Sequence, residues 1–299
     1  MKRADWQEEG GHMDGGHMDG AGDERAHVLF GYDGTADDDT ALRWAIEEAR
    51  LRGLDLVMCH CWHWPYPEGH EDPRAETVMR RAGRNLLERG TRRARELGAA
   101  GAVRGRLVRG PARDALVRES RAAALVVVAA PERLDEGAGT LDLAAGADRP
   151  VIVVKDGTGP RRVVAGADGS AWCDPALGFA AAEAALRGWE LRVVYACWEP
   201  AAVDADELAL FHDRELLEKT RAAELEAAVA PWRKRYPRLD ITVSLLLERP
   251  MEALFDAADD AGLLVLGDRG AGIAPLGSTS TAVLRRARRA VAIVPARPD

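Results

Sequence analysis

Residues Leu263 to Val294 read LLVLGDRGAGIAPLGSTSTAVLRRARRAVAIV, and this stretch decides the fold. The apolar run Leu263–Leu266 predicts a buried strand, the glycines after it predict a loop, and Val291–Val294 predicts a second strand. Between the strands we expect a helix that begins at Ser278, whose side-chain oxygen can cap free backbone N–H groups. A glycine loop before a helix N-terminus gathers unpaired N–H donors and partial positive charge. The stretch therefore fits a phosphate site, and it fits a tight connection without a ligand equally well.

The glycines of this loop carry a resemblance to a known family. Gly267-x2-Gly270, a spacer and the pair Gly277-Ser278 resemble the glycine signature of the universal stress proteins, whose ATP-binding members cradle the triphosphate with it. The family's spacer between the second glycine and the Gly-Ser pair is usually longer than the six residues found here, Ala271 to Leu276. Asp268 stands where the family usually has a small uncharged residue.

The resemblance implies an adenine-nucleotide site in the second half of the chain. By this resemblance Asp168 and the backbone around Gly166 and Ala167 contact the adenine and ribose. The expected binding residues are Gly166, Ala167, Asp168, Ser170, Gly267, Asp268, Arg269, Gly270, Gly272, Gly277 and Ser278. We expect ATP as the ligand, with ADP or AMP binding nearly as well because the short spacer brings the final helix close to the phosphates.

Three of these residues have a second interpretation. Asp168 could form an Asx-turn with the loop behind it, although the duplication described below favours ligand contact. Arg269 could pair with phosphate oxygens or be an ordinary solvated arginine. Asp268 could hold Mg²⁺ beside the phosphates or weaken triphosphate binding by repulsion, and we expect it to face solvent.

Length and composition limit the classes of protein to consider. The chain has 299 residues, of which 47% are hydrophobic and 30% charged, which is typical of a folded protein with two domains. A net charge of −8 argues against nucleic-acid binding. No apolar run approaches the ~20 residues of a membrane helix, and the first 25 residues lack a signal-peptide pattern. With four cysteines, a reduced, cytoplasmic protein without membrane or nucleic-acid partners is expected.

The chain contains an internal duplication. Residues His27 to Trp62 align with Arg162 to Trp198, so that Asp33 matches Asp168 and Cys61-Trp62 matches Cys197-Trp198. Each copy is too long for a solenoid repeat, so we expect tandem domains. The predicted organisation is a disordered tail at 1–25, a first domain at 26–155, a linker at 156–160 and a second domain at 161–296. The tail repeats GGHMD, and its histidines and aspartates could bind a metal, but we interpret it as an extension outside the fold.

Each domain alternates strands and helices, which predicts an α/β fold. In the second domain we expect strands at 162–168, 190–198, 239–247, 263–266 and 291–294, with a helix opened by Asp174 and Pro175 as N-cap and N1, and a long helix from about Asp204 to Lys234. Short strands between helices imply right-handed crossovers and a parallel sheet covered on both faces. The family resemblance implies two tandem doubly wound five-stranded sheets of order 3-2-1-4-5, like the adenine-nucleotide alpha-hydrolases. Asp168 and Gly267 should then meet at the crevice where the strand order reverses.

The first domain differs at its own phosphate loop. Ala129 replaces the first glycine, and Pro131, Glu132, Asp135 and Glu136 follow it. Proline lacks an N–H donor, and three carboxylates repel a polyphosphate, so we expect that this domain has lost nucleotide binding. In Cys59-His60-Cys61 the two cysteines point to one face of a strand and the histidine to the other, which favours core packing over a zinc site.

The sequence contains no catalytic constellation. It has no G-x-S-x-G, no H-E-x-x-H and no Walker A lysine after the glycine loop. We therefore expect a nucleotide-binding module for stress adaptation or dormancy signalling, not an enzyme. A nucleotide-free interaction scaffold and a slow ATPase are the alternatives. Short apolar strands such as Val151–Val154 at sheet edges need cover, so we also expect the domains to pack on each other and the protein to form a homodimer.

Overall fold

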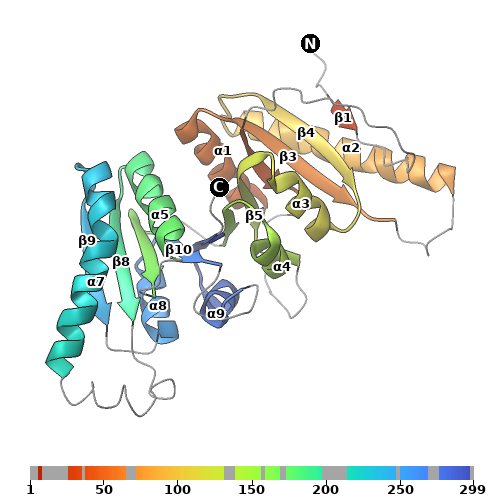
Figure 1. The fold of residues 1–299 in the computed structure, drawn as a ribbon. Helices are drawn as coiled ribbons and strands as arrows, with labels where there is room; N and C mark the ends of the chain where they lie inside the picture. The colour runs from red at the N-terminus through yellow and green to blue at the C-terminus, as the bar shows by residue number, and fades with distance from the viewer. Residues whose placement is uncertain are drawn as a thin grey trace, which may run out of the picture. The chain divides into compact units, whose positions relative to one another are not determined.

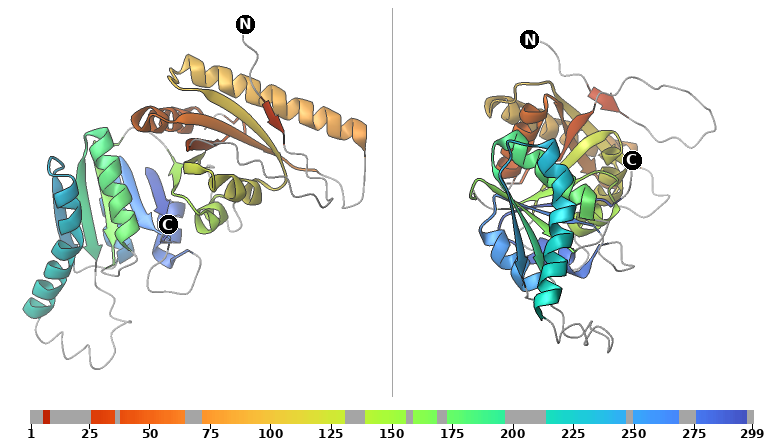
Figure 2. Two further views of the ribbon diagram at one scale, coloured as in Figure 1. Left: turned by 45° about the horizontal axis from the view of Figure 1, so that its top comes forward. Right: turned by 60° about the vertical axis from the view of Figure 1, so that its left-hand side comes forward.

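The computed structural model describes residues 6–8, 26–35, 38–64, 72–130, 139–155, 159–168, 173–196, 214–246, 250–268 and 276–296. The chain divides into two compact units, Met1–Val154 and Lys155–Asp299, called here the first and second units. Each unit is an α/β sheet of parallel strands with helices on both faces (Figures 1 and 2).

The first unit has the expected alternation of elements. Its strands run in the order β4-β3-β2-β5-β6, which is 3-2-1-4-5 within the unit, so the predicted order is confirmed. α1 and α2 cover one face, and α3 and α4 cover the other. The elements are β2 (His27–Gly31), α1 (Asp38–Arg52), β3 (Asp55–Trp62), α2 (Pro73–Glu96), β4 (Val103–Arg109), α3 (Ala112–Ser120), β5 (Ala123–Ala129), α4 (Gly139–Gly146) and β6 (Val151–Val154).

The predicted tail contributes one strand that the sequence analysis did not foresee. β1 (Trp6–Glu8) pairs in parallel with β4, from Trp6 opposite Gly105 to Glu8 opposite Leu107. The tail has no apolar periodicity, so only the unpaired edge of β4 explains why these residues form a strand. The GGHMD repeats lie outside the described residues.

The second unit repeats the topology with the order β9-β8-β7-β10-β11. α5 and α7 cover one face of its sheet, and α8 and α9 cover the other (Figure 2). The elements are β7 (Arg162–Ala167), α5 (Asp174–Arg187), β8 (Glu190–Ala196), α7 (Arg214–Arg235), β9 (Ile241–Leu246), α8 (Pro250–Asp259), β10 (Leu263–Gly267), α9 (Ser278–Arg286) and β11 (Ala290–Val294). The first part of the long predicted helix, residues 204–213, lies outside the described residues.

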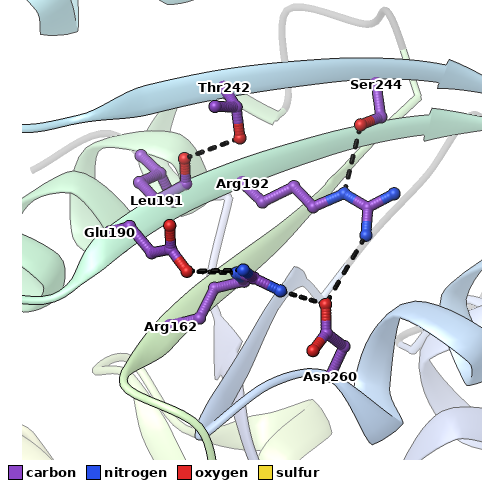
Figure 3. A network of polar contacts seen from close by, with 7 residues as sticks. All are labelled: Arg162, Glu190, Leu191, Arg192, Thr242, Ser244 and Asp260. Carbon is purple, nitrogen blue, oxygen red and sulfur yellow. Dashed lines mark hydrogen bonds and ion pairs between the residues drawn. The ribbon is translucent and has the colours of Figure 1, made fainter.

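Burial explains why the central strands read as continuous apolar runs. Val163, Val164, Leu263, Leu264 and Val265 are fully buried, because helices cover both faces of a parallel sheet. The amino ends of the strands are held by a polar network around Arg162 (Figure 3). Arg162 pairs with Glu190 at 2.6 Å and with Asp260 after α8, while Arg192 donates to Ser244 at 3.1 Å. This network ties α8 to the edge of the sheet opposite the predicted site.

Candidate functional site

The carboxyl ends of β7 and β10 lie side by side in the second unit. The two strands pair in parallel with Leu263 opposite Val163 and Val265 opposite Ala165, so both reach the same edge of the sheet. β7 ends with Gly166 and Ala167, and Asp168 follows it with an exposed side chain. The strand order reverses between β7 and β10, which is where ligands of doubly wound sheets bind. The structure therefore brings Asp168 and Gly267 to one edge.

Two hydrogen bonds fix the start of α9 at this edge. Gly277 N–H donates to the carbonyl of Asp268 at 2.9 Å, and Ser280 Oγ donates to the carbonyl of Gly267 at 2.9 Å. The two residues that bound the loop, Asp268 and Gly277, are therefore in direct contact. Its Arg269, Gly270 and Gly272 lie outside the described residues, as does Ser170, so their predicted roles stay predictions.

The prediction that Ser278 caps the last helix is wrong by one residue. Gly277 is the N-cap of α9, with ψ at 149°, and no side chain in the described part of the chain caps it. Ser278 is the first helical residue and is exposed, while the hydroxyl of Ser280 is turned toward β10. Because the first N–H groups of a helix have no partner within it, this uncapped end leaves donors for an anion.

Asp268 does not face solvent as we expected. Its side chain is 4% exposed, and Oδ1 accepts from Ala296 N–H at 2.9 Å. Its own N–H donates to the carbonyl of Val294 at 2.9 Å. Asp268 therefore joins the end of β10 to the chain that follows β11. This structural bond was hidden from sequence reasoning because Ala296 is far along the chain.

The glycine at the end of the first strand of each unit has a packing role. A Cβ on Gly166 would lie 2.5 Å from Leu266 Cδ2 and 3.0 Å from Leu254 Cδ2. A Cβ on Gly31 would lie 3.0 Å from Val128 Cγ1 in the same way. The absence of a side chain lets α8 or α3 approach the strand end, so packing requires these glycines independently of any ligand.

A buried thiol beside Asp168 was missed by the sequence analysis. Burial, with a smaller contribution from the nearby carboxylates of Asp168 and Asp174, raises the pKa of the Cys173 thiol to about 11. Cys173, not Asp174, is the N-cap of α5, so that Asp174 and Pro175 are each one position further into the helix than predicted. The only sequence signal was its short distance in the chain from Asp168.

The first unit has a small pocket at its equivalent edge. The pocket, about 210 Å³ in volume, is lined by residues that include Gly31, Asp33, Cys61, Arg113, Val128 and Thr140. This volume lies below the range of about 300–1,000 Å³ that is usual for ligand pockets of drug size. Asp33 accepts from Thr35 N–H at 2.8 Å, which is the Asx-turn that was the alternative interpretation for Asp168.

Two cysteines of β3 lie at this pocket. Cys59 Sγ and Cys61 Sγ are 4.0 Å apart, with Cys59 buried and Cys61 partly exposed. The hydrogen bond between them lowers the pKa of the Cys61 thiol and raises that of Cys59, which burial raises further. His60 lies on the other face, with Nδ1 2.9 Å from the carbonyl oxygen of Tyr32. Within the described ranges, no three His, Cys, Asp or Glu residues form a metal-binding group.

A larger pocket lies at the opposite end of the second unit. It has a volume of about 650 Å³ and is lined by Trp189, Glu190, Tyr236 and Arg238 among others. Arg187 stacks on the Trp189 ring at 5.1 Å, and Glu190 pairs with Arg162 (Figure 3). Arg187 and Glu190 thus both have structural partners, and we assign the pocket no ligand.

Comparison with known proteins identifies the family. The model of the universal stress protein family matches residues 24–155 and, a second time, residues 159–295. The chain belongs to the universal stress protein family. The tandem arrangement of two universal stress protein domains, expected from the internal duplication, agrees with the two matches.

Individual universal stress proteins are similar over most of the chain. Rv2005c of Mycobacterium tuberculosis is 29% identical over 292 residues, which cover 87% of this chain and 94% of that protein. Rv1996 of the same organism is 27% identical over 298 residues, which cover 89% of this chain and 94% of that protein. A universal stress protein structure from Archaeoglobus fulgidus DSM 4304 has a TM-score of 0.65 at 18% identity, covering 91% of this chain and 97% of that one. This last likeness shows the fold. Among the described residues, no helix has the length and apolar character needed to cross a membrane.

Proposed function

We propose that the second unit binds an adenine nucleotide, ATP in the first instance, at the carboxyl edge of β7 and β10. The observation that carries the proposal is the position of α9. Its N-terminus has no side-chain cap among the described residues and is held beside Gly267 by the Gly277 and Ser280 hydrogen bonds. Free N–H groups and the helix dipole both favour a phosphate at this point.

The nucleoside is proposed to lie over the end of β7. The Asp168 carboxylate is exposed there and can accept hydrogen bonds from ribose hydroxyls or the adenine amino group. Gly166 and Ala167 end the same strand and are partly exposed, so a flat ring can lie against the backbone at this end of it. The phosphates then extend toward the loop that starts after Asp268.

The short loop sets the expected preference among nucleotides. A backbone hydrogen bond joins Asp268 and Gly277 directly, so the two ends of the segment between them are adjacent. We propose that the site holds the first phosphates well and the last one less well, so that ADP and AMP bind nearly as tightly as ATP. The buried Asp268 carboxylate is committed to Ala296, and Mg²⁺ would therefore bind mainly through the phosphates themselves.

The proposed role is that of a nucleotide-dependent binding module in stress adaptation. Neither the sequence nor the described part of the structure provides a set of catalytic groups that would favour ATP hydrolysis. The first unit is proposed to contribute no nucleotide site, because its pocket is small and its Asp33 carboxylate is held in a turn. One chain should therefore bind one nucleotide.

Titration calorimetry with ATP, ADP and AMP tests the proposal. We expect one site in the wild type, little or no binding in Gly270→Val, and affinity about 10- to 150-fold weaker in Asp168→Ala, since a hydrogen bond to a charged group contributes about 1.5–3 kcal/mol. Asp33→Ala, the matched substitution in the first unit, should bind like the wild type.

Two outcomes contradict the proposal. If Asp33→Ala abolishes binding while Asp168→Ala does not, the site belongs to the first unit. If the wild type binds no adenine nucleotide at millimolar concentration, and none co-purifies in mass spectrometry, the protein is an interaction scaffold and the nucleotide proposal is wrong.

A further inference from the structure

We propose that Cys59 and Cys61 form a dithiol site that binds a thiophilic metal or metalloid ion through two sulfur atoms. The residues are two apart on β3, so their side chains share one face of the sheet. Their Sγ atoms are 4.0 Å apart, and both residues line the pocket at the carboxyl edge of the first unit. The sequence alone predicted core packing, which describes the buried Cys59 but not the partly exposed Cys61.

The distance between the sulfur atoms fits chelation better than a disulfide. Two thiolates bound to one tetrahedral ion at about 2.3 Å stand about 3.8 Å apart, close to the distance observed. A disulfide requires a separation of about 2.05 Å and Cα atoms no more than about 6.8 Å apart. The Cα atoms of residues two apart in an extended strand are about 6.6–6.8 Å apart. This distance is at the upper limit for a disulfide, so the two cysteines are poorly placed to form one. An ion would be bound with almost no change in the backbone.

The residues around Cys59 and Cys61 favour ions that require only two sulfur ligands from the protein. His60 is turned away, with Nδ1 at the Tyr32 carbonyl, and cannot be a third ligand in this conformation. The pocket of about 210 Å³ leaves room beside Cys61 for a small non-protein ligand on the ion. Soft thiolates favour soft ions, and a trivalent arsenical with one organic group, or a soft cation that completes its coordination with non-protein ligands, satisfies these conditions.

The second unit has no counterpart of this site. β8 pairs Gly166 with Val194, just as β3 pairs Gly31 with Cys59. The equivalents of Cys59 and Cys61 are therefore Val194 and Ala196, which corrects the alignment of Cys61 with Cys197 made from sequence. The second unit thus supplies substitutions that this fold already accommodates at both positions: Cys59→Val and Cys61→Ala.

The test is titration of the full-length reduced protein with phenylarsine oxide, followed by native mass spectrometry and by counting free thiols. We expect one arsenical per chain and the loss of two free thiols in the wild type, because two As–S bonds replace the bond to oxygen, which leaves as water with the two thiol protons. Cys59→Val and Cys61→Ala should each bind at least about 100-fold more weakly, because a second ligand on the same site raises affinity by about 10²–10⁴. Cys173→Ser is the control, and it should bind like the wild type.

A parallel titration with Cd²⁺, followed by thiolate-to-metal absorption, distinguishes a metal site from a metalloid site. Absorption that disappears in Cys61→Ala supports the proposal for cations, and binding of the arsenical alone supports it for metalloids. Circular dichroism verifies that the variants are folded. The proposal is wrong if the wild type binds neither probe, or if either probe binds folded Cys59→Val and Cys61→Ala as tightly as the wild type. Nucleotide titration is unaffected by these outcomes, because the two sites are in different units.

Discussion

The two units share one topology, but each attaches its long helix to the neighbouring helix on the same face of the sheet in a different way. In the first unit, Asp39 at the start of α1 accepts two hydrogen bonds from Arg93 of α2, at 2.6 and 3.1 Å. In the second unit, Asp174 at the equivalent position accepts from Trp232 Nε1 of α7 at 3.2 Å. A carboxylate is retained at the helix start, while its partner changes from a charged to a neutral donor.

A glycine makes the second arrangement possible. A Cβ on Gly178 would lie 2.5 Å from the Trp232 ring, so only glycine leaves room for the indole. The first unit has Arg43 at the equivalent position, which contributes to the charges around Asp39. The fold therefore accepts either an arginine or a tryptophan as the donor to this aspartate, provided that the neighbouring residue, Arg43 or Gly178, leaves enough room. At the sheet edge the same freedom places two thiols, Cys59 and Cys61, where the second unit has Val194 and Ala196.

We expect the largest change in the free energy of unfolding from variants that affect a buried glutamate present in both units. Glu48 and Glu183 are fully buried, and each accepts from an arginine one turn further along its helix, Arg52 at 3.1 Å and Arg187 at 3.2 Å. Arg187→Met should lower the free energy of unfolding of the second unit by about 3–5 kcal/mol, because it removes the charge partner of a buried carboxylate. Urea unfolding, with hydrogen exchange read separately for each unit, measures the effect.

The first unit provides the matched comparison. Trp44 Nε1 also donates to Glu48 at 3.1 Å, and the Arg52 side chain is 20% exposed, compared with 6% for Arg187. Arg52→Met should therefore cost less than Arg187→Met. The double variant Glu183→Leu/Arg187→Met should recover most of the stability, since a buried pair can be replaced by apolar side chains. An equal or larger cost for Arg52→Met contradicts this account.

The sheet could be predicted from sequence, because its signals are local. Apolar runs such as Leu263–Leu266 are buried on both faces, and the strand limits follow from them within one or two residues. The strand order came from the family resemblance and is confirmed in both units. The duplication located Asp168 at the strand end, where it is exposed as a ligand residue needs to be.

The details of the site edge could not be predicted, because they depend on contacts between distant residues. Ser278 has the right side chain for a cap, but Gly277 takes the cap position and the serine that bonds β10 is Ser280. Asp268 looked like a loop carboxylate in solvent, yet its partner Ala296 follows the last strand. Such bonds exist only once the strands have been brought together.

Removal of the Asp268 carboxylate should have an intermediate effect. In the first unit the equivalent residue is Ala130, whose N–H donates to Val154 as the Asp268 N–H donates to Val294. Asp268→Ala should destabilise the second unit by about 1–3 kcal/mol, because Ala296 N–H loses its buried acceptor. Asp268→Asn keeps the acceptor and should cost less. If Asp268→Ala weakens nucleotide binding without loss of stability in urea unfolding, Asp268 acts as a ligand contact.

The smallest predicted effect depends on pH and separates the two kinds of helix attachment. The hydrogen bonds from Arg93 hold the pKa of Asp39 below its ordinary value of 3.8, and the charges of Arg93 and Arg43 act in the same direction against desolvation. A lowered pKa in the folded state stabilises the protein above the unfolded value, and this stabilisation is lost as the pH falls through the folded value. Arg93→Met should therefore weaken the first unit near neutral pH, and its difference from the wild type should shrink below about pH 4.

The contribution of the exposed Arg93–Asp39 ion pair to stability should be small and should depend on salt. The Arg93 and Asp39 side chains are 43% and 46% exposed, so solvent screens the pair and we expect only a small loss of stability at low ionic strength. At about 1 M salt most of it should disappear, because screening then acts within about 3 Å. Trp232→Phe in the second unit removes a donor without charge, so its cost should persist in high salt. Urea unfolding of each variant at low and high salt compares the two, and an Arg93→Met effect that is indifferent to salt would show that the arginine stem, not its charge, holds α2 to α1.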